Sequence, residues 1–189
     1  MSAPTTLDLT GTWDIDPAHT RLGFAARHAM VATVRGGFDV FSGEIVLDQA
    51  DPSASSATVE IDAASLSTGN AQRDEHVRGA DFLDVESFPT ITFRSTAVEQ
   101  VEDDEYRMHG ELTIKGVAKP VTLELEFQGS ARDPFGNTRG GFEGRTTINR
   151  KDWGLSWNVA IEGGGILVGE KVKLELDVSA IKRVAPAAE

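Results

Sequence analysis

The chain has 189 residues, a length that suggests one domain with short tails. Its 18 basic and 30 acidic residues give a net charge of -12. This balance argues against general nucleic-acid binding and against docking on anionic lipid through a basic patch, because both need clustered positive charge. Cysteine is absent, so disulfides, thiolate nucleophiles and cysteine metal sites are excluded.

The first ten residues, MSAPTTLDLT, have neither the basic stretch nor the apolar core of a signal peptide. No apolar run approaches the roughly 20 residues that span a bilayer. We therefore expect a cytoplasmic protein with no integral membrane segment. Residues 1–10 and 183–189 are expected to be disordered tails, and residues 11–182 to be the folded domain.

Alternation of apolar and polar residues predicts short strands in the first part of the chain. Residues 28–34 (HAMVATV) break the alternation and fit either a helical turn or an irregular strand bend. The pair Gly36-Gly37 predicts a bulge or a sharp bend. The segments with clear alternation are residues 13–16, 21–26, 41–48 and 59–63.

Residues 70–78 carry the one short helical pattern, which Gly79 is expected to stop. Asp74 and Arg78 are four residues apart and are expected to pair on one helix face. In one interpretation Arg73, Asp74, Arg78 and Asp81 fasten this segment to the rest of the fold by ion pairs. In the other, Arg73, His76 or Arg78 meets a polar head group at a cavity mouth.

Further strands follow, and the clearest of them is the last. Residues 172–178 alternate strictly between apolar and charged side chains. Glu170 falls on the apolar side of this pattern, so either a bulge turns it outward or it is a polar group near a pocket mouth. The other predicted strands in this half cover residues 91–94, 106–115, 121–127 and 142–148.

Eight to nine half-buried strands joined by turns predict an antiparallel sheet with one wet face. A closed barrel and a sandwich both satisfy this pattern, and the alternation does not separate them. A barrel of about eight strands can hold one small ligand.

Catalytic and metal-binding patterns are not evident in the sequence. The four histidines (His19, His28, His76 and His109) lack the spacing of a metal site. No nucleophile elbow, Ser-x-x-Lys motif or phosphate-binding loop is present. We expect neither a cofactor nor an enzymatic activity.

Several ordered motifs together resemble one known family, the YceI-like polyisoprenoid-binding proteins, over about residues 13–181. The resemblance implies a lipocalin-like, eight-stranded antiparallel barrel with one or two short helices. Its apolar interior would hold a long isoprenoid chain or another amphiphile. Many family members are periplasmic, whereas we expect this chain to be cytoplasmic because its first residues do not resemble a signal peptide. The main motifs are Trp13-x-Ile15-Asp16-x-x-His19-Thr20, Asn70-x-x-Arg73-Asp74-x-His76-x-Arg78, Phe88-Pro89-x-Ile91-x-Phe93 and Asn149-Arg150-x-Asp152-Trp153-Gly154.

We therefore expect a protein that binds a long-chain apolar lipid in the barrel interior as a carrier, store or sensor. Each CH₂ group taken out of water contributes about 0.8 kcal/mol. The expected lip residues are His28, Arg73, His76 and Arg78. The expected wall residues are Phe24, Phe38, Ile61, Ile91, Phe93, Met108, Leu112, Leu123, Leu125 and Phe142.

Two other functions stay open at this point. One is an enzyme that acts on a lipid-like substrate with His28 or His76 as acid or base. The other is a stress-related protein-interaction module without a small ligand. The sequence also leaves the oligomeric state open, with a homodimer among the alternatives.

Overall fold

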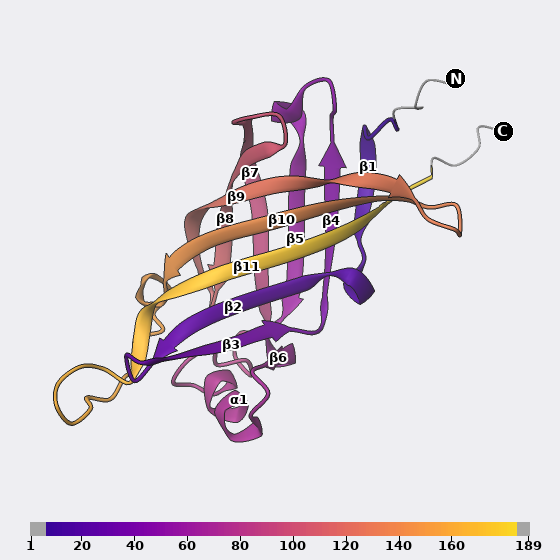
Figure 1. Ribbon diagram of the computed structural model, residues 1–189. Helices are drawn as coiled ribbons and strands as arrows, with labels where there is room; N and C mark the ends of the chain where they lie inside the picture. Colours follow the sequence, from indigo (N-terminus) through magenta and orange to yellow (C-terminus); the bar gives the residue numbers. More distant parts are fainter. Residues whose placement is uncertain (1–6, 185–189) are drawn as a thin grey trace.

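A computed structural model describes residues 7–184 of the chain, and within them the fold is almost entirely β (Figure 1). One helix of two turns, α1 (Ala71–Arg78), interrupts the strands, together with short 3₁₀ turns such as η1 (Pro17–His19) and η4 (Arg150–Trp153). The strands are β1 (Gly11–Ile15), β2 (Arg21–His28), β3 (Ala32–Phe38), β4 (Phe41–Leu47), β5 (Ser56–Asp62), β6 (Leu66–Ser67), β7 (Thr90–Gln100), β8 (Glu105–Ile114), β9 (Val117–Arg132), β10 (Thr138–Asn149) and β11 (Val168–Lys182).

Eight of these strands close into an antiparallel barrel, as expected. The hydrogen-bonded order is β1-β4-β5-β7-β8-β9-β10-β11, and β11 pairs back to β1. Closure joins the two ends of the domain, with Trp13 opposite Lys182 and Ile15 opposite Ala180. A closed sheet of this kind leaves few unpaired strand edges.

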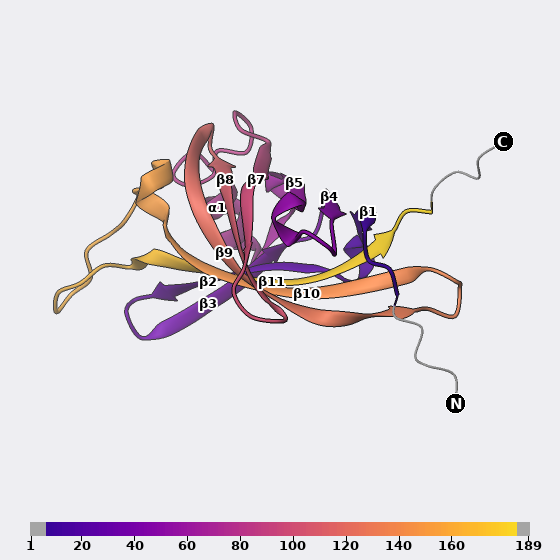
Figure 2. The same ribbon diagram turned by 90° about the horizontal axis from the view of Figure 1, so that it is seen from above.

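The long strand β11 carries two neighbours on one edge. Its end pairs with β1 around Ala180, while the stretch from Val168 to Asp177 pairs with β2. The strands β3 and β6 continue the sheet beyond β2. Figure 1 shows β9, β10, β11, β2 and β3 running obliquely across the steeper strands β4, β5, β7 and β8, and Figure 2 shows these two sets as crossed layers.

The structure at β3 differs from what the sequence predicted for residues 28–34 and for Gly36-Gly37. Residues 28–34 form no helix; their broken alternation marks the turn by which β2 reverses into β3 through Ala29 and Met30, which both have positive φ (48° and 62°). The predicted bulge at Gly36-Gly37 is also wrong, since both residues keep continuous register with β2. Gly36 instead makes room, because a β-carbon there would lie 2.6 Å from the ring of Phe24. With the two-residue strand β6, β3 raises the strand count above the predicted eight to nine.

The helix α1 begins and ends where the sequence predicts. The side chain of Asn70 caps its first turn by accepting a hydrogen bond from the backbone N–H of Arg73 at 2.9 Å. Gly79 follows its last residue. The helix lies at the lower end of the barrel in Figure 1, beside β6.

Residues 7–10 and 183–184 belong to the described part of the chain and contact the barrel. Leu9 accepts a hydrogen bond from the indole of Trp13 (3.0 Å), and Arg183 forms ion pairs with Asp14 (2.6 Å) and Glu44 (2.8 Å). Residues 1–6 and 185–189, which include most of both predicted tails, lie outside the described residues. No helix among residues 7–184 has the length and apolar character to cross a membrane.

Candidate ligand-binding interior

The predicted wall residues all lie on the strands of the sheet, and they divide into two groups by burial. One group is packed tightly in the main core and consists of Ile91, Phe93, Met108, Leu112 and Leu123. The other group is only half-buried and consists of Phe24, Phe38, Ile61, Leu125 and Phe142. The tight group comes from β7, β8 and β9. Four of the five half-buried residues lie along β2, β3, β9 and β10, which form the less closely packed side, while the fifth, Ile61 of β5, lies opposite Ile91.

Strand β11 adds an apolar row to this looser side. Its inward residues Val172, Leu174, Leu176 and Val178 are half-buried, whereas the alternate residues Lys171, Lys173, Glu175 and Asp177 are exposed. Leu174 lies opposite Phe24 on β2 and opposite Thr146 on β10. The strict alternation of residues 172–178 was the sequence signal for this row, but the row was missing from the expected ligand contacts.

Glycines on the inner face allow large side chains to lie flat against the sheet. A β-carbon at Gly110 would overlap the ring of Phe93, and one at Gly144 would meet Leu125 at 2.9 Å. Small residues of this kind permit a neighbouring side chain to approach the backbone closely. The shape of the interior therefore depends on glycine positions as well as on the apolar wall.

The loop before α1 is bound to the helix by polar contacts of Asp74 and Arg73, and the predicted Asp74–Arg78 ion pair is not formed. Asp74 is buried (6% exposed) and its carboxylate accepts hydrogen bonds from the backbone N–H (2.9 Å) and the hydroxyl (2.5 Å) of Thr68. Arg73 donates to the same residue, from Nε to the hydroxyl oxygen (2.7 Å) and from Nη2 to the carbonyl (3.0 Å). We call Thr68, Arg73 and Asp74 the helix brace.

Arg78 also serves the fold and does not pair with Asp74. Its Nη2 donates to the backbone carbonyl of Leu66 in β6. Asp81, the fourth residue expected to form ion pairs, lies against His76 instead, with 2.9 Å between Oδ2 and Nε2. Arg73 and Arg78 thus donate hydrogen bonds to backbone carbonyls and a hydroxyl. Of the three lip residues predicted in this segment, only His76 is exposed.

An aromatic cluster joins α1 to the segment after β10. The ring of His76 contacts Trp157 edge to face, with 4.6 Å between centroids, and Phe82 lies 5.4 Å from Trp157. The guanidinium of Arg150 stands 5.8 Å from the centre of the Phe82 ring. Such contacts favour one relative position of the two segments.

Arg150 is a buried cation whose role could not be read from the sequence. It is 5% exposed, and it donates from Nε to Gly169 (2.9 Å), from Nη2 to Val168 (3.2 Å) and from Nη1 to Leu155. All three acceptors are backbone carbonyls. Burial lowers the pKa of this guanidinium from its ordinary value. The motif around Asn149-Arg150 identified the residue, but nothing in its spacing indicated burial.

Glu170 is turned outward by a bulge, which was the first of the two alternatives that the sequence left open. The register between β11 and β2 shifts between Val168 and Val172, and in this bulge Glu170 pairs with Lys151 (2.5 Å). The hydrogen bond from Lys151 lowers the pKa of the Glu170 carboxyl. The residue belongs to a surface ion pair.

His28, the remaining predicted lip residue, is exposed at the end of β2, opposite Val168 and Ala32. Within residues 7–184, the histidines and carboxylates form no group of three that could hold a metal ion.

A depression of about 370 Å³ lies where β2, β3 and β4 meet, and it includes apolar residues of the inner face. Another of about 440 Å³ is lined mainly by outward charged residues of β8 to β11. The first depression is lined by Pro17, Thr20, Arg21, Leu22, Arg35, Gly36, Gly37, Phe38, Asp39, Phe41 and Ser67. It places Phe38, a predicted wall residue, beside an opening at the surface.

Comparison with known proteins agrees with this architecture. The chain is 36% identical to a UPF0312 protein of Vibrio vulnificus over 90% of its own length and 86% of that protein. Its fold is similar to Burkholderia cenocepacia BcnA (TM-score 0.75, 25% identity, 87% of this chain and 98% of that chain). It is also similar to a polyisoprenoid binding domain from Saccharophagus degradans (TM-score 0.66, 16% identity, 90% and 98%). The model of the YceI-like domain matches residues 13–180, and the chain therefore belongs to the YceI-like family.

Proposed function

We propose that the protein binds a long apolar lipid, a polyisoprenoid or a similar amphiphile, inside the barrel and acts as its carrier, store or sensor. The observation that carries the proposal is the half-buried row of β11, namely Val172, Leu174, Leu176 and Val178. These side chains point inward, yet packing leaves part of their surface uncovered. An extended hydrocarbon is the kind of ligand that would cover such a row.

The two sides of the barrel differ in a way that suits this role. The tightly packed side around Phe93 and Leu112 supplies stability, while the looser side around Leu174 and Phe24 supplies apolar surface for a ligand. Burying one CH₂ group contributes about 0.8 kcal/mol, so a chain of about ten carbons has a sufficient driving force before the costs of binding. The name of the Saccharophagus degradans domain, which shares the fold, supports an isoprenoid as the ligand class.

The test is extraction of the purified protein with organic solvent, followed by mass spectrometry. We expect about one long-chain lipid per protein molecule. The delipidated protein should then take up a polyisoprenoid alcohol, and this binding should change the fluorescence of the protein's tryptophans. Absence of any lipid from the extract, together with no uptake by the delipidated protein, would contradict the proposal.

A further inference from the structure

Two hairpin tips lie side by side at one end of the long strands. The turn between β2 and β3 meets the segment 159–167, where the backbone N–H of Ala29 donates to the carbonyl of Leu167 at 2.7 Å. The second segment is itself a hairpin, since Leu167 donates to Val159 at 2.9 Å. Figure 1 shows both at the lower left, opposite the loop between β9 and β10.

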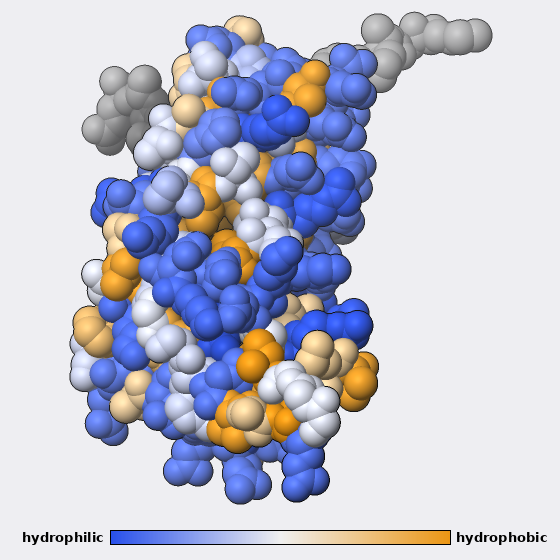
Figure 3. Space-filling view, turned by 90° about the vertical axis from the view of Figure 1, so that its left-hand side faces the viewer, coloured by the Kyte–Doolittle hydropathy of each residue, from blue (hydrophilic) through white to orange (hydrophobic). Residues whose placement is uncertain are grey.

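These tips present apolar side chains to solvent. Met30, Val31 and Val159 are 59%, 82% and 47% exposed. Met30 packs against Gly165 of the neighbouring hairpin, so the two tips form one surface. Figure 3 faces this end of the molecule and shows apolar side chains gathered on its lower part. We call Met30, Val31, Val159, Ile161, Ile166 and Leu167 the apolar tip; its last three members are half-buried.

The strands that lead to the apolar tip carry positive charge on their outer face. Arg35 and Lys173 lie in one cross-strand row with Ala25 between them, and Arg27 and Lys171 lie nearer the tip. All four are exposed, and none of them forms an ion pair with another described residue. We call these four residues the basic collar.

The opposite charge is concentrated further along the same face. Glu126 lies opposite Glu143, which lies opposite Asp177, so three carboxylates stand in one row. The net charge of -12 therefore hides a separation of charge along the sheet. Near the apolar tip, Glu162 is the one acidic residue in segments 27–35 and 155–169, and Glu170, which follows them, is paired with Lys151.

We propose that the apolar tip docks on the surface of a bilayer that contains anionic lipid. Met30, Val31 and Val159 enter the boundary between head groups and acyl chains, and the basic collar lies against the lipid phosphates. Apolar insertion combined with electrostatic attraction is the general basis of reversible binding at a membrane surface. The carboxylate row of Glu126, Glu143 and Asp177 keeps that part of the sheet away from the same surface. The inference concerns an interaction surface and stands whether or not the interior holds a lipid.

The first test is flotation of the full chain with phosphatidylcholine vesicles, with and without phosphatidylglycerol. We expect binding that increases with phosphatidylglycerol and falls with added salt. The double substitution Met30→Asp/Val31→Asp should weaken binding by about tenfold or more. Phe135→Asp is the matched control, because Phe135 is 87% exposed on the β9–β10 loop at the other end, and it should bind as the unchanged protein does.

The second test concerns the basic collar. Arg35→Gln/Lys171→Gln should lower binding and flatten its dependence on salt, whereas Arg132→Gln/Lys119→Gln removes the same charge from exposed positions outside the collar and should have little effect. Unfolding midpoints of all variants show whether each is folded. Absence of binding by the unchanged protein, equal loss in the control variants, or a dimer that forms through the tip without vesicle binding would each overturn the proposal. Lipid extraction measures the interior separately, so the two proposals fail independently.

Discussion

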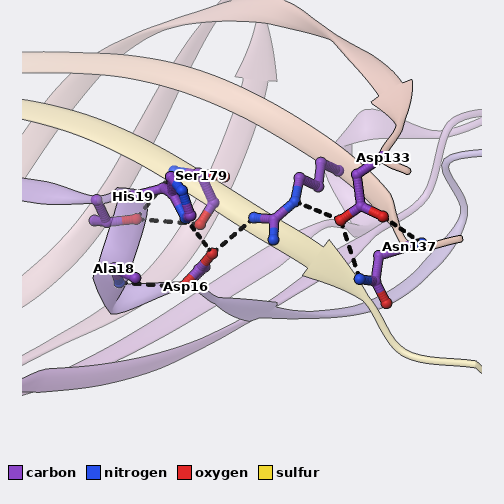
Figure 4. Close-up of polar contacts among 8 residues, drawn as sticks. Asp16, Ala18, His19, Asp133, Asn137 and Ser179 are labelled. Atoms are coloured by element: carbon purple, nitrogen blue, oxygen red, sulfur yellow. Dashed lines mark hydrogen bonds and ion pairs between the residues drawn. The ribbon is translucent and has the colours of Figure 1, made fainter. Parts of the chain in front are cut away.

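Arg139 on β10 and Asp16 after β1 lie 123 residues apart in the sequence and form an ion pair of 2.7 Å (Figure 4). The same guanidinium donates from Nε to Asp133 at 2.8 Å. Asp16 also caps η1 through the N–H of Ala18 and meets His19 at 2.8 Å. One arginine thus connects the β9–β10 loop with the corner where β1 closes the barrel.

This connection predicts a loss of stability in acid. The hydrogen bond from Arg139, with that of His19, lowers the pKa of Asp16 from 3.8 to about 2. A carboxyl whose folded pKa is depressed stabilises the fold above its unfolded pKa, and that contribution disappears as the pH falls through the folded value. Stability should therefore decline between about pH 4 and pH 2, by about 1 to 2 kcal/mol from Asp16 after solvent screening.

Urea unfolding at a series of pH values measures this effect, and Arg139→Met should reduce its slope below pH 4. Arg145→Met is the control, because the Arg145–Glu124 pair is exposed and 3.3 Å long. Arg139 also lowers the pKa of Asp133, so an equal change in slope for both variants would contradict the assignment to the two carboxylates that Arg139 pairs with.

The buried cation Arg150 leads to a second prediction. Replacing it with Met removes this donor from the carbonyls of Leu155 and Gly169, whereas the carbonyl of Val168 keeps the hydrogen bond from Asn158 (2.7 Å). Each unsatisfied buried group costs about 1 to 3 kcal/mol. We expect Arg150→Met to lower the free energy of unfolding by about 3 to 5 kcal/mol. Arg150→Lys should recover little, because an ammonium cannot reproduce the planar fork.

Denaturant unfolding tests this, with Lys151→Met as the neighbouring control. Lys151 pairs with Glu170 at an exposed site, so its removal should cost less than about 1 kcal/mol. Similar losses for Lys151→Met and Arg150→Met would show that the buried hydrogen bonds of Arg150 carry no special weight.

Alternation predicted most barrel strands because each has one apolar and one wet face. It did not predict how the barrel closes, since the pairing of Trp13 with Lys182 joins opposite ends of the domain. It also missed β3, whose turn places Ala29 and Met30 at positive φ. Such turns are normally marked by glycine or asparagine, and this one carries neither.

The site was predicted less well than the fold, because its contacts also join residues that the local sequence pattern does not connect. Asp74 and Arg78 have the spacing of a helical ion pair, but their actual partners, Thr68 and Leu66, come from the preceding segment. Local spacing cannot foresee such tertiary contacts. The burial of Arg150 was hidden in the same way, because charged residues are rarely buried without a charged partner.

The helix brace supports a third prediction, on the coupling of Thr68 and Arg73. Thr68→Val removes the hydroxyl that accepts from Arg73 and donates to Asp74, and Arg73→Met removes the other side of the first contact. The two substitutions should therefore be non-additive, with a coupling of about 1 kcal/mol in the free energy of unfolding.

A double-mutant cycle gives the coupling directly, and Thr68→Val combined with the exposed change Gln72→Ala should be additive. Lipid content should change only as far as the fold is lost. A fall in lipid content of Arg73→Met that exceeds its loss of folded protein would instead assign Arg73 to the ligand.

The fourth prediction uses two neighbouring residues of β11 that face opposite ways. Leu174 points inward and is half-buried, whereas Glu175 is exposed on the outer face. Leu174→Trp would occupy the space along the loose wall and should lower the extractable lipid by about tenfold, while overpacking costs about 1 to 3 kcal/mol of stability. Glu175→Trp adds the same ring outside the barrel and should leave the lipid content unchanged. Mass spectrometry of extracts from equal amounts of folded protein measures both. Only Leu174→Trp alters the interior. If it leaves the lipid content unchanged, or if Glu175→Trp lowers the lipid content equally, any bound lipid lies away from the β11 wall.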